Sequence, residues 1–131
     1  MLFILKGCAA VSSAPRGKEM NSQDLVEQMT VAELKAAIDS NQELVLLDVR
    51  EPHELEICKL PFTVHIPMGE LRFHLEDLEK YKNSEIIVYC RSGRRSNLAA
   101  DFLQECGFKV KNLKGGVLAW SDEIDSSFRK Y

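Results

Sequence analysis

The sequence lacks closely paired cysteines and an excess of positive charge. It has four cysteines in 131 residues, and no two of them are spaced as a Cys-x-x-Cys pair. This spacing indicates neither a zinc knuckle nor a thioredoxin-type redox pair. The net charge is −3 at pH 7, which argues against a nucleic-acid-binding surface. We expect no metal, no cofactor and no nucleic-acid partner.

Long apolar runs are absent as well. The run that follows Met1 has four apolar residues and is interrupted by Lys6. A secretory signal needs a basic start and a longer apolar core, and a membrane-spanning helix needs about 20 apolar residues. We therefore expect no membrane partner, a cytoplasmic location and reduced thiols. A lipid-modified Cys8 is the alternative.

Length and local composition indicate one folded unit. A chain of 131 residues is typical of a single domain. Residues 9–22 are rich in small and polar side chains, which is typical of a linker. We interpret residues 1–22 as an N-terminal tail or linker and residues 23–131 as the domain.

Helical and strand patterns alternate along this domain. Thr30 and Glu33 are spaced as a capping box ahead of apolar residues at helical spacing. The pattern predicts helices over 30–38, 51–55, 69–81, 98–106 and 117–124. Short apolar runs predict strands over 44–47, 63–66, 86–89 and 108–110. Such alternation is typical of a parallel sheet covered by helices on both faces.

Two polar residues are expected at one edge of this sheet. Asp48 and Cys90 each follow an apolar run, so both fall at the carboxyl ends of parallel strands, where ligands bind in such folds. Asp48 could also only cap its strand or pair with an arginine. Arg50 could be an ordinary surface charge.

The segment IVYCRSGRRS, residues 87–96, surrounds one cysteine with three arginines. A thiolate is the nucleophilic form of cysteine, and it is favoured by backbone N–H groups of a strand-to-helix turn and by nearby guanidinium groups. Gly93 allows the turn to close. A pocket of this kind would also bind an anionic substrate. The alternative is that Cys90 is an inert thiol and the arginines form a solvated surface loop. We expect Cys58 and Cys106 to be inert thiols of the core.

No histidine is placed to act as a base for Cys90. The three histidines are scattered along the chain, at positions 53, 65 and 74. A papain-like Cys–His mechanism is therefore unsupported.

Four segments in order resemble the motifs of rhodanese domains, a family of sulfurtransferases. They are LLDVREPHEL (46–55), HIP (65–67), VYCRSGRRS (88–96) and LKGGVLAW (113–120). The resemblance extends from about residue 30 to residue 120. It implies an α/β, rhodanese-like fold with a central, mostly parallel five-stranded sheet and helices on both faces.

The resemblance also implies a mechanism. Cys90 would take sulfane sulfur from a small anionic donor such as thiosulfate, form a persulfide and pass the sulfur to a thiophilic acceptor. The family pattern implies that the substrate-binding residues are Arg91, Ser92, Gly93, Arg94, Arg95 and Ser96. It implies that Asp48 and Arg50 support this loop. We expect Arg95 on an exposed part of it.

Three other functions stay open. A non-catalytic anion- or protein-binding module would share the fold, and so would an accessory sulfur-relay domain. Dual-specificity phosphatases are related, but they place an arginine six positions after the cysteine to clamp phosphate. Here that position is Ser96, and Tyr89 replaces the histidine usual before the phosphatase cysteine.

Two further features qualify the resemblance. Many rhodaneses have a Gly-Ala pair where this chain has Phe62-Thr63, so the local turn geometry is in doubt. Residues 119–131 resemble the end of rhodanese domains fused to ubiquitin-activating-like adenylyltransferases. That likeness implies a cysteine desulfurase or a sulfur-carrier protein as a partner.

Overall fold

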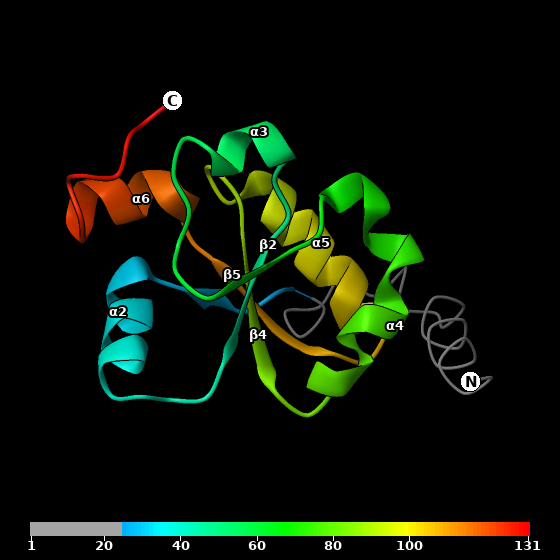
Figure 1. The fold of residues 1–131 in the computed structure, drawn as a ribbon. Helices are drawn as coiled ribbons and strands as arrows, with labels where there is room; N and C mark the ends of the chain where they lie inside the picture. Colours follow the sequence, from blue (N-terminus) through cyan, green and yellow to red (C-terminus); the bar gives the residue numbers. More distant parts are fainter. Residues whose placement is uncertain (1–24) are drawn as a thin grey trace.

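The computed structural model describes residues 25–131, which form one five-stranded sheet with helices on both faces (Figure 1). The strands are β1 (Gln28–Met29), β2 (Val45–Asp48), β3 (Thr63–His65), β4 (Glu85–Tyr89) and β5 (Lys109–Leu113). Their order is β1-β5-β4-β2-β3, and every neighbouring pair is parallel. The predicted α/β fold with a five-stranded parallel sheet is confirmed.

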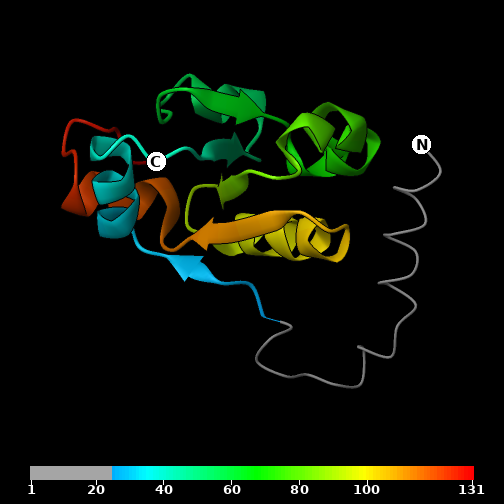
Figure 2. The same cartoon turned by 90° about the horizontal axis from the view of Figure 1, so that it is seen from below.

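The helices lie on the two faces of the sheet as the alternating pattern predicted. They are α2 (Val31–Asp39), α3 (Pro52–Leu55), α4 (Leu75–Leu78), α5 (Arg94–Glu105) and α6 (Gly116–Glu123), with 3₁₀ turns η3 (Met68–Phe73) and η4 (Glu79–Tyr81). Figure 2 shows α2 and α6 together on one side of the sheet, and α5 with the η3–α4 segment on the other. The capping box of Thr30 and Glu33 begins α2 as predicted.

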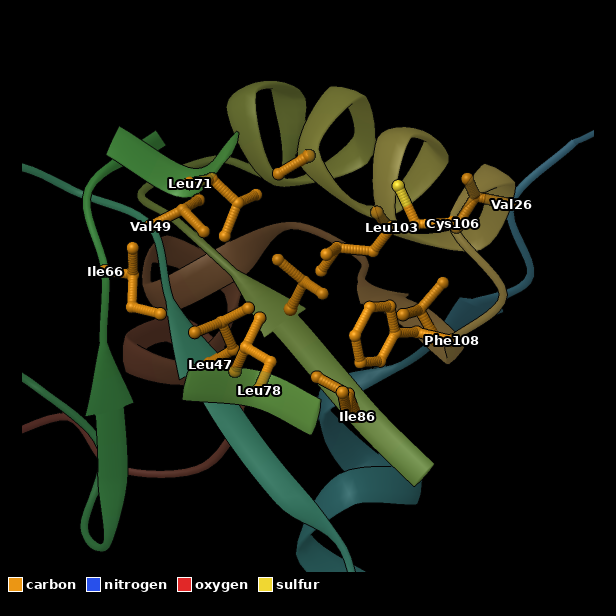
Figure 3. Close-up of a cluster of buried hydrophobic side chains, with 14 of the residues drawn as sticks. Val26, Leu47, Val49, Ile66, Leu71, Leu78, Ile86, Leu103, Cys106 and Phe108 are labelled. Carbon is orange, nitrogen blue, oxygen red and sulfur yellow. The ribbon is translucent and has the colours of Figure 1, made fainter. Parts of the chain in front are cut away.

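Each face of the sheet has its own apolar core. Leu47 and Ile86 pack toward α5 and α4 (Figure 3), and Val88 belongs to the same cluster. Leu46 and Ile87, which alternate with them, pack toward α2 and α6. Burying such a side chain fully contributes about 1.5–3 kcal/mol. A strand buried on both faces has no polar alternation, which is why β2 and β4 are continuous apolar runs.

The predicted helix over 69–81 is wrong. The segment forms η3, α4 and η4 in succession, and His74 between the first two has φ −122° and ψ 24°. The His74 and Asp77 N–H groups donate to carbonyls three residues back, the 3₁₀ pattern that tightens a helix. Leu71 and Leu78 are still buried, so the regularly spaced leucines face the core although the segment is not one continuous helix.

The predicted boundary between tail and domain stays a prediction. The tail assigned to residues 1–22 lies outside the described residues, as do positions 23 and 24. The first strand, β1, precedes the capping box and was not predicted, because two residues are too short to show a periodic pattern. Between residues 25 and 131 the structure has no helix long and apolar enough to span a membrane.

Candidate active site

Cys90 lies directly after β4, the central strand of the sheet. Its Sγ accepts hydrogen bonds from the N–H of Gly93 at 3.1 Å and the N–H of Ser96 at 3.4 Å. The Ser96 hydroxyl oxygen lies 3.3 Å from the same sulfur. Two backbone donors on one atom form a cradle that favours negative charge on that atom.

Glycines allow the cradle to close. Gly93 has φ +100°, a left-handed conformation that favours glycine. A Cβ atom on Gly116 would lie 2.4 Å from the Arg91 carbonyl oxygen and 2.5 Å from that of Cys90. Because Gly116 has no side chain, Val117 N–H donates to the Cys90 carbonyl and Leu118 N–H to that of Arg91. The first turn of α6 thus holds the backbone of the cysteine loop.

Arg95 is not on an exposed loop, so that expectation is wrong. It lies in the first turn of α5, and its guanidinium donates to both carboxylate oxygens of Glu54, at 2.7 and 2.9 Å. Glu54 belongs to α3 and is buried. The Arg95 hydrogen bonds lower the pKa of Glu54 from 4.5 to about 2. The pair therefore joins α3 to α5.

Arg91 also has a partner within the chain. Its Nε donates to the main-chain oxygen of Tyr131, and its guanidinium carbon lies 5.3 Å from the centre of the Tyr131 ring. Between residues 25 and 131, no hydrogen bond or ion pair of the Arg94 or Lys114 side chain is found, although the Lys114 main-chain N–H donates to the Met29 carbonyl. Both are exposed. Among the described residues that line the cavity, Arg94 and Lys114 are therefore the cations whose side chains are free to meet a solute.

Asp48 and Arg50 form a fully buried ion pair. Burial alone would lower the pKa of Arg50, but hydrogen bonds to Asp48 and to the Tyr131 hydroxyl raise it above its ordinary value. The Tyr131 hydroxyl in turn donates to Glu54 at 2.8 Å. Among the described residues, neither member of the pair makes a hydrogen bond to the Cys90 loop. Arg50 reaches the loop through Tyr131, Glu54 and Arg95.

A second buried network lies on the β5 side of the loop. Asn112 of β5 is 3% exposed. Its side chain accepts from the Ser96 hydroxyl at 2.5 Å and donates to the Gly93 carbonyl at 3.2 Å. It also donates to Gln28 of β1 at 2.9 Å. Asn112 lies opposite Val88 in the register of β4 and β5, two residues before the cysteine.

Sequence reasoning missed five residues of this site: Gln28, Glu54, Asn112, Lys114 and Tyr131. Glu54 and Lys114 fall within or next to the quoted motifs, so the motifs signalled their position but not their role. The partners of Asn112 and Tyr131 are 16 to 84 residues away in the sequence. No local pattern marks them.

The loop borders an open cavity of about 880 Å³. Its lining residues are Gln28, Arg91, Ser92, Gly93, Arg94, Arg95, Asn97, Leu98, Asn112, Lys114 and Gly115. All of the predicted substrate-binding residues except Ser96 are therefore on its wall, while Ser96 is buried beside Cys90. Asp48 and Arg50 lie outside it.

Comparison with known proteins gives one consistent result. The family model described as "Rhodanese-like domain" matches residues 30–123. "Putative sulfurtransferase YtwF" of Bacillus subtilis is 41% identical, over 75% of this chain and 93% of its own length. "Adenylyltransferase and sulfurtransferase UBA4" of Yarrowia lipolytica is 40% identical over 66% of this chain, which spans only 22% of that protein.

A solved structure agrees with these matches. The rhodanese-related protein of Thermoplasma volcanium has a TM-score of 0.68 and 32% identity, over 75% of this chain and 93% of its own. Sulfur transfer is the general activity that the relatives support.

Proposed function

The chain belongs to the rhodanese-like domain family, and on this premise we propose that it is a sulfurtransferase in which Cys90 carries sulfane sulfur as a persulfide. The observation that supports this role most directly is the cradle: two backbone N–H groups donate to Cys90 Sγ. A cradle of this kind stabilises an anionic sulfur without any metal or histidine.

The proposed reaction has two steps. The Cys90 thiolate attacks the outer sulfur of thiosulfate, an S–S bond forms, and sulfite leaves with the electron pair of the broken bond. A nucleophile such as cyanide then attacks the outer sulfur of the persulfide. The Cys90–sulfur bond breaks, thiocyanate forms, and the electron pair returns to Cys90 as the thiolate. This is ping-pong chemistry with a covalent intermediate.

The charges around the cavity suit an anionic donor. Arg94 and Lys114 line the cavity and would attract the anionic end of thiosulfate, since neither is neutralised by a described residue. Arg91, Ser92, Gly93 and Arg95 also line it, and we propose that they shape and bind the donor. Arg91 and Arg95 would do so while keeping their partners Tyr131 and Glu54.

Burial of the thiol limits the reacting group. Cys90 is 1% exposed, so a donor or acceptor must reach Sγ with a narrow terminal atom. A sulfane sulfur is such an atom. A phosphoryl group is wider, and the position where a phosphatase has its clamping arginine is the buried Ser96. This geometry disfavours phosphatase activity.

The cavity is large for thiosulfate alone. Its volume of about 880 Å³ falls in the range that holds drug-sized ligands. We propose that the partner in the cell is larger: a cysteine desulfurase that supplies sulfur or a sulfur-carrier protein that accepts it. The likeness to UBA4 supports a sulfur relay of this kind. Transfer of labelled sulfur between Cys90 and a purified partner would test it.

The persulfide itself can be tested by intact-mass spectrometry. The protein is incubated with thiosulfate, and we expect the mass of one added sulfur, which cyanide then removes. Cys90→Ser should give no addition, whereas Cys58→Ser, the matched change at the half-buried thiol, should behave as the wild type. A protein that stays unmodified with thiosulfate and with a persulfidated cysteine desulfurase would favour the non-catalytic binding module.

A further inference from the structure

Ser96 has two neighbours that compete for one hydrogen. Its hydroxyl oxygen lies 2.5 Å from Oδ1 of Asn112 and 3.3 Å from Sγ of Cys90. A serine hydroxyl can donate only one hydrogen bond at a time. Ser96 is fully buried, so water does not supply the missing donor.

The orientation of the Asn112 amide settles which neighbour receives the hydrogen in this structure. Its Nδ2 donates to the Gly93 carbonyl and to Oε1 of Gln28. The Gln28 amide is oriented in turn, because its Nε2 donates to the Val26 carbonyl and to Asn97. Both amides are therefore fixed by acceptors on their nitrogen side, and Oδ1 of Asn112 must face Ser96.

It follows that the Ser96 hydrogen points at Asn112 and a Ser96 lone pair faces the sulfur. This arrangement suits an uncharged Sγ, because a thiol S–H can donate to that lone pair. It does not suit a thiolate, since two electron-rich atoms would then face each other. The hydroxyl must rotate toward Sγ when the sulfur is charged, and Oδ1 of Asn112 then loses its donor in a buried place.

We propose that Asn112 is a positioning residue for the thiol chemistry, which holds the Ser96 hydrogen while Sγ is uncharged and releases it when Sγ carries the negative charge. This role rests on the function proposed above. When the thiolate attacks a donor, the charge moves to the outer sulfur, and the hydrogen returns to Asn112. When an acceptor removes that sulfur, the electron pair stays on Sγ, and the hydroxyl rotates back.

The proposal predicts that Asn112 restrains the free thiolate. Removing its oxygen frees the Ser96 hydroxyl to donate to Sγ without leaving a buried acceptor unpaired. Asn112→Ala should therefore raise the rate at which iodoacetamide alkylates Cys90 at pH 7 by about five-fold, the effect of one ordinary hydrogen bond. In the Ser96→Ala background there is no hydroxyl to release, and the same substitution should change the rate by less than about two-fold.

The experiment is a double-mutant cycle of four proteins: wild type, Asn112→Ala, Ser96→Ala and the double variant. Alkylation of the peptide that contains Cys90 is followed by mass spectrometry. Circular dichroism and thermal unfolding check that each protein is folded. If Asn112→Ala does not fold, Asn112→Ser replaces it, because the shorter side chain withdraws the Oδ1 acceptor from Ser96 but keeps a polar group in the buried site. Gln28→Ala is the control, since it loosens Asn112 but leaves Oδ1 in place.

Two outcomes would overturn the proposal. An equal rate increase in both backgrounds would mean that Asn112 acts only by holding the loop in shape. No increase in the alkylation rate in either background would mean that Asn112 and Cys90 do not compete for the Ser96 hydrogen. Alkylation needs no sulfur donor, so this result is separate from the persulfide mass measurement. Absence of the added sulfur in that measurement would instead contradict the proposed function.

Discussion

At the scale of single residues, the charge on the cavity wall is divided between paired and free groups. Arg95 is bound by Glu54 and Arg91 by Tyr131, so both guanidinium groups are already engaged in contacts within the protein. Arg94 and Lys114 are exposed on the same wall. Attraction of a small anion should therefore depend most on the two free groups.

Substitution of the two free cations should show their effect on binding of the anionic donor. Arg94→Gln and Lys114→Gln should each raise KM for thiosulfate by about five-fold at low salt, with a smaller effect in added salt because solution ions screen exposed charges. Lys109→Gln is the matched control, since Lys109 is exposed at the opposite end of β5. Steady-state kinetics with cyanide as acceptor would measure the change. An unchanged KM in both variants would contradict the assignment.

Phe62 is a residue in an unfavourable backbone conformation. It has φ +57° and a side chain that is 95% exposed, at the place where many family members have glycine. The left-handed region costs an ordinary L-residue roughly 1–2 kcal/mol. The turn that the sequence left in doubt is thus formed in spite of Phe62.

Replacing this residue should stabilise the protein. Phe62→Gly removes the backbone strain, but glycine loses more conformational entropy on folding, which costs roughly 0.5–1 kcal/mol. We therefore expect a net gain of about 0.5–1 kcal/mol in the free energy of unfolding. Urea denaturation at pH 7 would measure it. Asn41→Gly is the control, because Asn41 has a similar φ of +59° but asparagine tolerates it. A loss of stability in Phe62→Gly would argue against strain at this turn.

At the scale of elements, the site depends on two helix starts meeting one strand end. The N-terminal turn of α5 provides the Ser96 N–H, and that of α6 donates to the Cys90 and Arg91 carbonyls. Both junctions need glycine in the left-handed region, at Gly93 and Gly116. The approach of α6 leaves no room for a side chain.

Gly116→Ala should therefore be severely destabilising. Its methyl group would overlap two carbonyl oxygens, and its φ of +58° is unfavourable for alanine. We expect a loss of more than about 3 kcal/mol, seen as a lower midpoint of thermal unfolding or as insoluble protein. Gly69→Ala is the matched control, because nothing lies within 4 Å of its Cβ position. Equal stability of the two variants would contradict this account of the junction.

The elements that the sequence predicted well are those with one strong local signal. The continuous apolar runs predicted β2 and β4, and the capping box predicted the start of α2. The segment 69–81 failed because leucines at intervals of three and four fit a 3₁₀–α–3₁₀ path as well as one helix. β1 could not be predicted, since its pairing with β5 is set by residues about 84 positions away.

At the scale of the whole molecule, a network of hydrogen bonds and one ion pair joins segments that are far apart in the sequence. Tyr131 connects Arg50 to Glu54, and Glu54 connects α3 to α5. The motif residues predicted which loop holds the thiol, but this network was out of reach of the sequence. Its members have no spacing in common and meet only when the sheet has formed.

The network should make stability depend on acidity. Because the pKa of Glu54 is about 2 in the folded protein and 4.5 ordinarily, its contribution is fully present above about pH 4.5 and is lost as the pH falls toward 2. Glu54→Gln should lower the free energy of unfolding at pH 7 by about 1–3 kcal/mol. It should also make the free energy of unfolding fall less steeply between pH 4.5 and 2.

Denaturation in urea at several pH values would measure this dependence. Glu76→Gln is the control, because Glu76 is also in a short helix but is exposed. Its curve should follow that of the wild type. If the Glu54→Gln curve falls as steeply as the wild type below pH 4.5, another group is responsible for the acid sensitivity.

The position of Cys90 within the chain has a consequence for biosynthesis. The residues that surround the thiol from the β5 side, Asn112 and Gly116, follow it by 22 and 26 positions. Because a chain leaves the ribosome from its N-terminus at about 5–20 residues per second, the thiol is made before the groups that enclose it. Cys90 therefore leaves the ribosome 22 and 26 residues ahead of these two groups, and until they follow and the sheet forms, its sulfur lacks both the N–H cradle and the burial of the folded site.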